Sequence, residues 1–389
     1  MPSSPANSDP AATVIVGMSG GVDSAVAALL LRDAGYSVQG LFMSNWDDDD
    51  AYCTAAEDFQ DARATCETLG IPLHRASFST EYRERVFAHF LREYSAGRTP
   101  NPDVLCNREI KFGVCLDYMR RLGADLIATG HYARLEHGTP GTRLLKARDT
   151  SKDQSYFLHA VPARALENVL FPLGELTKHE VRRRAHAAGL RVFDKADSTG
   201  ICFVGERPFE EFLSRYLADS EGPIETPEGR PLGQHRGLAF YTLGQRSGLR
   251  LGGKAGAAEA PWYVADKHAG RNALIVVQDH DHPLLLSDEF DVEDMRWLGP
   301  VAGTPLECAV KTRYRQSDLA CRLSVRDGGR VRVSLSAPAR AVTPGQYAVF
   351  YDGDVCLGGG VIAERRNTSA AARGARRIST NSLFSLEGS

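Results

Sequence analysis

The segment Ser19–Ser24 has residue types and spacing that could bind the phosphates of a nucleotide. It reads Ser-Gly-Gly-Val-Asp-Ser and follows a β-branched run, Thr13–Val16. Gly20 and Gly21 allow a tight turn that brings backbone N–H groups close to an anion. A helix starting there offers unpaired N–H groups and a partial positive charge, which favour phosphate. The Walker A pattern is absent, and an ordinary capped strand–turn–helix is the alternative.

Two of the eight cysteines lie in segments that could make a thiol reactive. Cys106 follows Pro100 and Pro102, which predict a stiff exposed loop, and it precedes a predicted helix whose N-terminus would stabilise a thiolate. Cys202 lies in a polar, glycine-containing turn, Asp197–Glu206. No Cys-x-x-Cys pair and no zinc-site spacing occurs, so no metal ligand is predicted. For either cysteine alone, the alternative is an inert, half-buried thiol.

Asp23 places a carboxylate within the predicted phosphate loop. Such a carboxylate would be badly placed without a cation, and Mg²⁺ bridging the phosphates would explain it. A helix-capping aspartate is an equally good interpretation. A second acidic run, Asp47–Asp50, is interpreted as a solvated loop and not as a metal site.

The first half of the chain alternates predicted strands and helices, which indicates an α/β fold with a parallel sheet and helices on both faces. In such sheets ligands bind beyond the carboxyl ends of the strands, where Ser19–Ser24 and Gly130-His131 are expected. Capping boxes are predicted at Thr54 and Thr177. Strands are expected at Thr13–Val16, Tyr36–Met43, Pro72–Ser77 and Leu126–Thr129, and helices at Ser24–Ala34 and Arg108–Leu122.

The second half has a different pattern, with glycine, proline and short β-like runs from Gly222 to Asp281. From Asp291 onward, alternating residues separated by turns such as Asp352-Gly353 predict a compact antiparallel barrel. We therefore expect a disordered N-terminus (1–12), a catalytic α/β domain (13–215), a small central domain (216–285), a C-terminal β-barrel (286–366) and a disordered tail (367–389).

Composition sets broad limits on the function. The chain has 389 residues, is 43% hydrophobic and has a formal net charge of −3, which is typical of a globular protein without a global preference for nucleic acid. Ten Lys/Arg against six Asp/Glu between residues 301 and 366 nevertheless indicate a locally basic barrel. No stretch approaches the roughly 20 apolar residues of a membrane span. No secretory signal is recognised, so a cytoplasmic protein with reduced cysteines is expected.

The hexapeptide Ser19–Ser24 resembles the PP-loop of the ATP pyrophosphatases, which cleave ATP between the α and β phosphates and leave AMP on a substrate oxygen. Longer strings, from about Thr13 to Arg366, resemble the bacterial tRNA-specific 2-thiouridylases. These strings are Gly17–Ser24, Gly40–Trp46, Tyr52–Ala56, Ala96–Phe112, Ala128–Tyr132, Lys152–Phe157, Asp197–Glu206, Tyr241–Arg246, Lys311–Gln316 and Val342–Gln346.

The resemblance implies a three-domain enzyme that thiolates C2 of the wobble uridine, position 34, in the tRNAs for Lys, Glu and Gln. Cys202 would carry a persulfide received from a sulfur-donor protein, Cys106 would be the partner nucleophile, and Asp103 would lie against the target base. The implied ATP-binding residues are Gly17, Met18, Ser19, Gly20, Gly21, Val22, Asp23, Ser24, Met43 and Gly130. The implied tRNA contacts are Asn101, Pro102, Asp103, His131, Lys152, Asp153, Gln154, Arg313, Tyr314 and Gln346, with Arg313 and Tyr314 expected in a barrel strand.

The chemistry of such an enzyme is consistent with these residue types. Transfer of AMP to O2 makes a poor leaving group a good one, and a persulfide can then attack C2. Attack by Cys106 on the persulfide bond would leave a Cys106–Cys202 disulfide, whereas prior release of sulfide is the alternative route. An iron–sulfur cluster on Cys106, Cys202 and Asp103 also stays open. The competing functions are an amide-forming PP-loop synthetase and a noncatalytic RNA-binding protein, and a monomer is expected.

Overall fold

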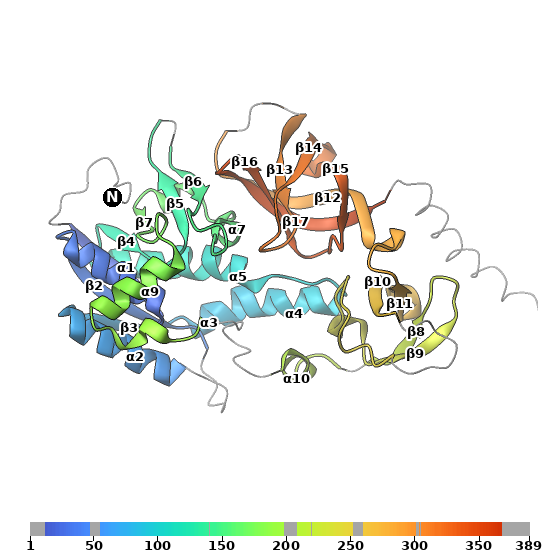
Figure 1. Cartoon of the computed structure of the whole chain (residues 1–389), viewed down its shortest axis with the longest axis horizontal. Helices are drawn as coiled ribbons and strands as arrows, with labels where there is room; N and C mark the ends of the chain where they lie inside the picture. The colour runs from blue at the N-terminus through green and yellow to red at the C-terminus, as the bar shows by residue number, and fades with distance from the viewer. Residues whose placement is uncertain are drawn as a thin grey trace, which may run out of the picture.

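The computed structural model describes residues 12–46, 55–139, 141–197, 208–218, 220–251, 260–300, 303 and 305–367. Within these ranges the strands form three sheets, one in each part of the molecule (Figure 1). The predicted capping box at Thr54, the acidic run Asp47–Asp50 and Cys202 lie outside the described residues. In the described residues, no helix has both the length and the apolar character needed to cross a membrane.

The N-terminal sheet is parallel throughout, as the alternating pattern predicted. Its strand order is β3-β2-β1-β4-β7. The carboxyl ends of β1 and β4 lie side by side, because Val16 pairs with Ala128, so the segments that follow these strands are brought together. The strands are β1 (Thr13–Met18), β2 (Ser37–Ser44), β3 (Leu73–Ser77), β4 (Leu126–Ala128) and β7 (Val169–Leu170).

Helices cover both faces of this sheet, because alternate residues of β1 enter different cores. Val14 and Val16 pack in the cluster that contains α1, whereas Ile15 packs in the cluster that contains Leu116 of α6. The helix α9 begins with the predicted capping box, in which the Thr177 side chain accepts from the backbone of Glu180. The first face is covered by α1 (Val22–Asp33), α2 (Ala55–Leu69) and α9 (Lys178–Ala187); the second by α3 (Ser79–Tyr82), η1 (Arg83–Phe87) and α6 (Cys115–Arg121). Helix α4 (Ala88–Ser95) continues from η1 away from this sheet (Figure 1).

The helix predicted at Arg108–Leu122 begins earlier in the structure. The loop predicted before it is therefore wrong from Pro102 onward, where the chain is helical. Helical structure starts at Pro102 as α5 (Pro102–Leu105) and continues through the π-helical η2 (Cys106–Val114) into α6. Pro102 occupies the first turn, where a missing N–H costs nothing, and the Asn101 side chain accepts from the Asp103 backbone N–H at 3.1 Å. The proline therefore starts this helix and does not prevent it.

The C-terminal sheet closes into the predicted antiparallel barrel. Its six strands run in the order β12-β15-β14-β13-β16-β17, and pairing of β12 with β17 closes the ring. Arg313 and Tyr314 lie in the turn after β13 and not in a barrel strand, so that expectation is wrong. The strands are β12 (Leu286–Trp297), β13 (Leu306–Lys311), β14 (Leu319–Val325), β15 (Val331–Arg340), β16 (Tyr347–Asp352) and β17 (Val355–Arg366).

A hairpin of the N-terminal half extends the barrel sheet. Its second strand pairs with β17 through Leu145 opposite Val355 and Leu144 opposite Cys356. The barrel is thereby joined through backbone hydrogen bonds to the chain that follows β4. This hairpin comprises β5 (Ala133–Glu136) and β6 (Arg143–Lys146), and the short helices α7 (Ser155–Leu158) and α8 (Ala163–Leu166) follow it.

The central part is a small four-stranded sheet in the order β10-β11-β8-β9, in which β8 and β11 are parallel. In Figure 1 it lies beyond the C-terminal end of α4, on the side of the molecule away from the parallel sheet. The elements are α10 (Phe209–Ser214), β8 (Gly222–Glu225), β9 (Pro231–His235), β10 (Trp262–His268) and β11 (Ala273–Gln278).

Candidate active site

The glycine-rich loop after β1 is shaped so that a Cβ at Gly20 would force the backbone to shift. Gly20 has φ +77°, and an added Cβ would lie 2.3 Å from the Asp58 carbonyl oxygen on α2. Gly21 is the N-cap of α1 and has extended backbone angles. The space beside Gly21 is open, because an added Cβ would lie 3.5 Å from the Ser19 Oγ atom, an ordinary van der Waals distance. The loop therefore packs closely on α2 on one side.

Two serines and a second glycine complete the shape of this loop. The Ser24 Oγ atom accepts from the Ser19 N–H at 3.2 Å and donates to the Gly21 carbonyl at 3.0 Å. Gly130, after β4, packs against the first turn of α1, where a Cβ would lie 2.7 Å from the Ser24 nitrogen. The first N–H groups of α1 have no partner within the helix. A glycine-lined cradle with free N–H groups is a suitable site for nucleotide phosphates.

The other predicted nucleotide-binding residues lie around the same loop. Gly17 lies in β1 beside Thr129. Met18, which ends β1, and Val22 are buried, and Met43 is half-buried on the neighbouring strand β2. The parallel sheet therefore brings all ten predicted positions to one edge, although nothing in the structure tests their contacts with ATP.

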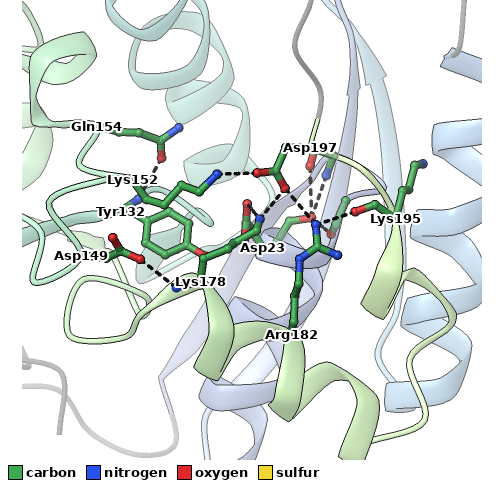
Figure 2. A network of polar contacts seen from close by, with 12 residues as sticks. Asp23, Tyr132, Asp149, Lys152, Gln154, Lys178, Arg182, Lys195 and Asp197 are labelled. Atoms are coloured by element: carbon green, nitrogen blue, oxygen red, sulfur yellow. Dashed lines mark hydrogen bonds and ion pairs between the residues drawn. The ribbon is translucent and has the colours of Figure 1, made fainter. Parts of the chain in front are cut away.

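Asp23 is neutralised by a lysine that the sequence reasoning missed. It lies in the first turn of α1 and is not its N-cap, so the capping interpretation is wrong in the strict sense. Its carboxylate accepts from Lys178 Nζ at 2.8 Å and from the Tyr132 hydroxyl at 2.8 Å (Figure 2). Lys178 of α9 thus supplies a cation beside Asp23, as one interpretation of a carboxylate in this loop had called for.

Asp197 is bound to the same lysine. Lys178 Nζ lies 2.7 Å from Asp197 Oδ1, Lys152 Nζ lies 2.7 Å from Oδ2, and Arg182 is 3.4 Å away. Partial burial alone would raise the pKa of Asp197, but the hydrogen bonds from Lys152 and Lys178 outweigh this and lower the pKa to about 2. Figure 2 shows the resulting chain of charges from Asp23 to Lys152. The first residue of the predicted Cys202 turn is therefore held beside the phosphate loop.

Lys195 connects the same segment to the opposite side of the loop. Its Nζ atom donates to the Gly20 carbonyl at 3.2 Å and to the Asp58 carboxylate at 2.8 Å. Burial lowers the pKa of Lys195, but the hydrogen bonds to Asp58 and Asp61 outweigh this, so the net shift is upward. Lys178 and Lys195 thus place an ammonium group on each side of the loop, and each of them is shared between two carboxylates.

The Cys106 thiol is buried, contrary to the expectation of an exposed loop. Its exposed fraction is 3%, and it lies at the start of the π-helical segment η2, a type of distortion that is frequent at functional sites. Solvent reaches nearby Asp103, yet protein atoms surround its carboxyl group densely enough to raise its pKa, and Lys111 partly opposes this rise. Cys202 lies outside the described residues, so the predicted approach of the two thiols is not tested.

The structure brings together two of the segments predicted to contact tRNA. The Tyr314 ring lies 4.4 Å from the ring of Phe157, which is three residues after Gln154 in the chain. Lys311 Nζ, near Arg313, lies 3.5 Å from the Asp153 carboxylate. The start of α7 and the turn after β13 therefore form one surface.

Several side chains that were predicted to contact tRNA already form hydrogen bonds with other groups of the protein. The Asp153 carboxylate is 4% exposed and accepts from the Ala147 and Ser155 backbone N–H groups. Gln154 Oε1 accepts from the Tyr132 N–H. These side chains support the site from within, and their contacts with RNA stay predictions.

His131 also lies inside the protein. It is 8% exposed, its Nδ1 atom is 2.7 Å from Thr129 Oγ1, and its ring packs between Phe112 and Phe171. Burial, with a smaller contribution from Lys111, holds the pKa of His131 well below its usual value. The imidazole is therefore neutral, which argues against a cationic contact with a phosphate.

Lys178, which the sequence reasoning missed as a partner of Asp23, had only a weak signal in the sequence. The capping box at Thr177 places Lys178 in the first turn of a helix, but Lys178 is 155 residues from Asp23 and no periodicity connects them. Among the described residues, no group of three or more His, Cys, Asp or Glu side chains is arranged to hold a metal ion.

Comparisons with known proteins agree with this architecture. Three family models match in order: "tRNA methyl transferase HUP domain" over residues 12–206, "tRNA methyl transferase PRC-barrel domain" over 210–278 and "Aminomethyltransferase beta-barrel domain" over 287–362. A protein of Chromohalobacter salexigens named tRNA-specific 2-thiouridylase MnmA is 57% identical over 92% of this chain and 94% of its own length. The chain belongs to the tRNA-specific 2-thiouridylase family. Relatives with the same name from Alcanivorax borkumensis and Marinobacter nauticus are 58% and 55% identical over 90% and 96% of this chain, and 97% and 96% of their own length.

Membership of the 2-thiouridylase family makes this protein a tRNA sulfurtransferase with a PP-loop fold that uses ATP. Among solved structures, a U34-tRNA thiolase, NcsA, from Methanococcus maripaludis with its [4Fe-4S] cluster is 18% identical over 52% of this chain and 63% of its own, with a TM-score of 0.33. A likeness this distant adds no argument about the site.

Proposed function

We propose that this protein thiolates C2 of the wobble uridine, position 34, in the tRNAs for Lys, Glu and Gln. The observation that carries the proposal is identity of 55–58% to tRNA-specific 2-thiouridylases over 90% or more of the chain. The glycine cradle at Gly20 and Gly130 supports it, because replacement of a carbonyl oxygen requires prior activation by a nucleotide.

In the first step, O2 of the uridine attacks the α-phosphorus of ATP. An O–P bond forms, the bond from the α-phosphorus to the bridging oxygen breaks, and diphosphate leaves. The loop Ser19–Ser24 would bind the phosphates through its backbone N–H groups. Lys178 and Lys195 would offset the phosphate charge by exchanging a carboxylate partner for a phosphate oxygen. Mg²⁺ would add charge neutralisation at the phosphates; because Asp23 is already paired with Lys178, a metal bound there must share or displace that lysine.

In the second step, sulfur replaces the activated oxygen. The outer sulfur of a persulfide on Cys202 attacks C2, and AMP leaves with the former O2. Attack of the Cys106 thiolate on the inner sulfur then breaks the S–S bond and forms a Cys106–Cys202 disulfide, which a thiol reductant must reopen. In the alternative order, Cys106 attacks first and releases sulfide, which then attacks C2.

The remaining parts of the proposal concern partners. A protein that carries a persulfide would load Cys202, and the basic barrel with the turn at Arg313 and Tyr314 would contact the RNA. We further propose that the enzyme acts as a monomer in the cytoplasm.

The test is reconstitution with purified full-length protein. The protein is incubated with tRNA, ATP, Mg²⁺ and a sulfide or persulfide source, and thiouridine is detected by its retardation in a mercury-containing gel. We expect product with the wild type and none with Cys106→Ser or Cys202→Ser. Unimpaired product in both variants would reject the proposed chemistry. A noncatalytic RNA-binding protein gives no product with the wild type, and an amide-forming synthetase forms AMP without RNA.

A further inference from the structure

The turn between α4 and α5 is a point where all three parts of the molecule meet. Helix α4 ends at Ser95, and the chain turns back through residues 96–100 toward α5 and Cys106 (Figure 1). Gly97 has φ +74° in this turn, and its N–H donates to the Tyr94 carbonyl at 2.9 Å. The turn leads directly into Asn101–Asp103, a segment predicted to contact tRNA, in which Asp103 is expected against the target base.

The barrel holds this turn through its backbone. The Thr99 N–H donates to the Pro344 carbonyl at 3.0 Å, and Gln346 Nε2 donates to the Thr99 carbonyl at 2.8 Å. Gly345 has φ +92°, and a Cβ there would lie 2.8 Å from the Thr99 nitrogen. Both backbone groups of Thr99 are therefore bound by one barrel loop.

The central domain holds the same turn from the other side. Thr242 Oγ1 lies 3.3 Å from Thr99 Oγ1, and Lys267 Nζ on β10 donates to the Gly97 carbonyl at 2.9 Å. Burial lowers the pKa of Lys267 to about 8, and no acidic group among the described residues offsets this. The ammonium lies beside the C-terminal end of α4, where the helix dipole favours a cation.

We propose that Lys267 is a positioning residue for the thiolation reaction: together with Thr242 and Gln346, it holds the Gly97–Thr99 turn so that Asp103 and Cys106 are correctly placed. Pro100 and Pro102 stiffen the short connection, so displacement at Thr99 is passed on to Asp103. The inference rests on the proposed function. It assigns to the central domain a role in the chemical step, in addition to any role in RNA binding.

The test compares Lys267→Met with Lys267→Arg. Methionine keeps an unbranched side chain one atom shorter and removes the donor, whereas arginine keeps the cation and an N–H donor. Arg230→Met is the matched control, because Arg230 is an exposed cation of the same domain. Three quantities are measured: the single-turnover thiolation rate at saturating tRNA, the Kd for tRNA by filter binding, and deuterium uptake by a peptide covering residues 96–105.

We expect Lys267→Met to lower the single-turnover rate about tenfold or more, equivalent to about 1.4 kcal/mol. We also expect it to raise deuterium uptake at residues 96–105 and leave the Kd for tRNA within about twofold, since a residue acting on orientation changes the rate more than the binding. Lys267→Arg should recover most of the rate, and Arg230→Met should retain it. Thr242→Val, which keeps the volume, should lower the same rate if Lys267→Met does not fold.

Three results would overturn the inference: an unchanged rate in folded Lys267→Met (or in Thr242→Val if Lys267→Met does not fold), a loss confined to the Kd, or a lost rate with unchanged deuterium uptake. Failure of the proposed function is separate, because the wild type itself would then form no thiouridine.

Discussion

Replacing Gly20 by alanine should destabilise the protein more than the same change at Gly70 or Gly21. An alanine at φ +77° costs about 1–2 kcal/mol, because its Cβ crowds the following carbonyl in the left-handed region. Its Cβ would also lie 2.3 Å from the Asp58 carbonyl oxygen, on the backbone of α2. Relieving such a contact by shifting packed backbone costs about 1–3 kcal/mol. The combined loss in the free energy of unfolding is therefore about 2–5 kcal/mol.

Two other glycines separate these contributions. Gly70 has φ +67° with no atom within 4 Å of an added Cβ, so Gly70→Ala should lose about 1–2 kcal/mol from backbone strain alone. Gly21 has φ −100°, so Gly21→Ala introduces no left-handed strain. Its gain of about 0.4–1 kcal/mol through the unfolded chain is opposed by the poorer capping of alanine at the N-cap, so the stability should stay within about 1 kcal/mol of the wild type.

The assay is urea unfolding followed by far-ultraviolet circular dichroism, with binding of a fluorescent ATP analogue measured on the folded proteins. Gly20→Ala should weaken analogue binding, because the loop must move away from α2, whereas Gly70→Ala should not. If Gly20→Ala and Gly70→Ala lose the same stability within about 0.5 kcal/mol, the close contact between the loop and α2 is refuted.

Three further outcomes are expected. Lys178→Met leaves Asp23 and Asp197 without their shared cation. AMP formation with tRNA and ATP should then fall about tenfold or more, since hydrogen bonds to charged groups contribute about 1.5–3 kcal/mol. Lys178→Arg should retain more activity than Lys178→Met, and equal activity of Lys178→Met and the wild type would contradict the pairing. The pKa of Asp197 lies below its unfolded value, so its ion pairs stabilise the fold above about pH 4, and this contribution is lost as the pH falls toward 2. Asp197→Asn should accordingly show a shallower decline in stability between pH 4 and pH 2, and parallel declines would disprove the linkage. Tyr132→Phe removes one hydrogen-bond donor to Asp23 and should lower the free energy of unfolding, measured in urea, by about 1 kcal/mol. An unchanged free energy of unfolding would argue against that hydrogen bond.

Local patterns in the sequence were sufficient to predict several features of the fold. The β-branched run before Gly20 predicted a buried parallel strand, the Thr177 capping box predicted the start of α9, and alternation after Asp291 predicted the barrel. These signals are readable because each depends on residues within one turn of helix or one strand. The resemblance added the family, and the comparisons confirm it.

The errors concern where a helix begins, whether a thiol is buried and where a strand ends. Pro102 looked like the end of regular structure, but Asn101 caps it into the first turn of a helix. Cys106 looked exposed, but the helix that begins there packs into the core. Arg313 and Tyr314 looked like strand residues, but β13 ends before them.

The sequence alone therefore determined the elements, their class and the phosphate-binding loop, since these follow from propensity, capping and periodicity over a few residues. The tertiary structure decided which charges meet: Lys178 reaches Asp23 across 155 residues, and Lys267 reaches Gly97 across 170. Such pairings depend on how sheets and helices pack in three dimensions, which no local pattern encodes.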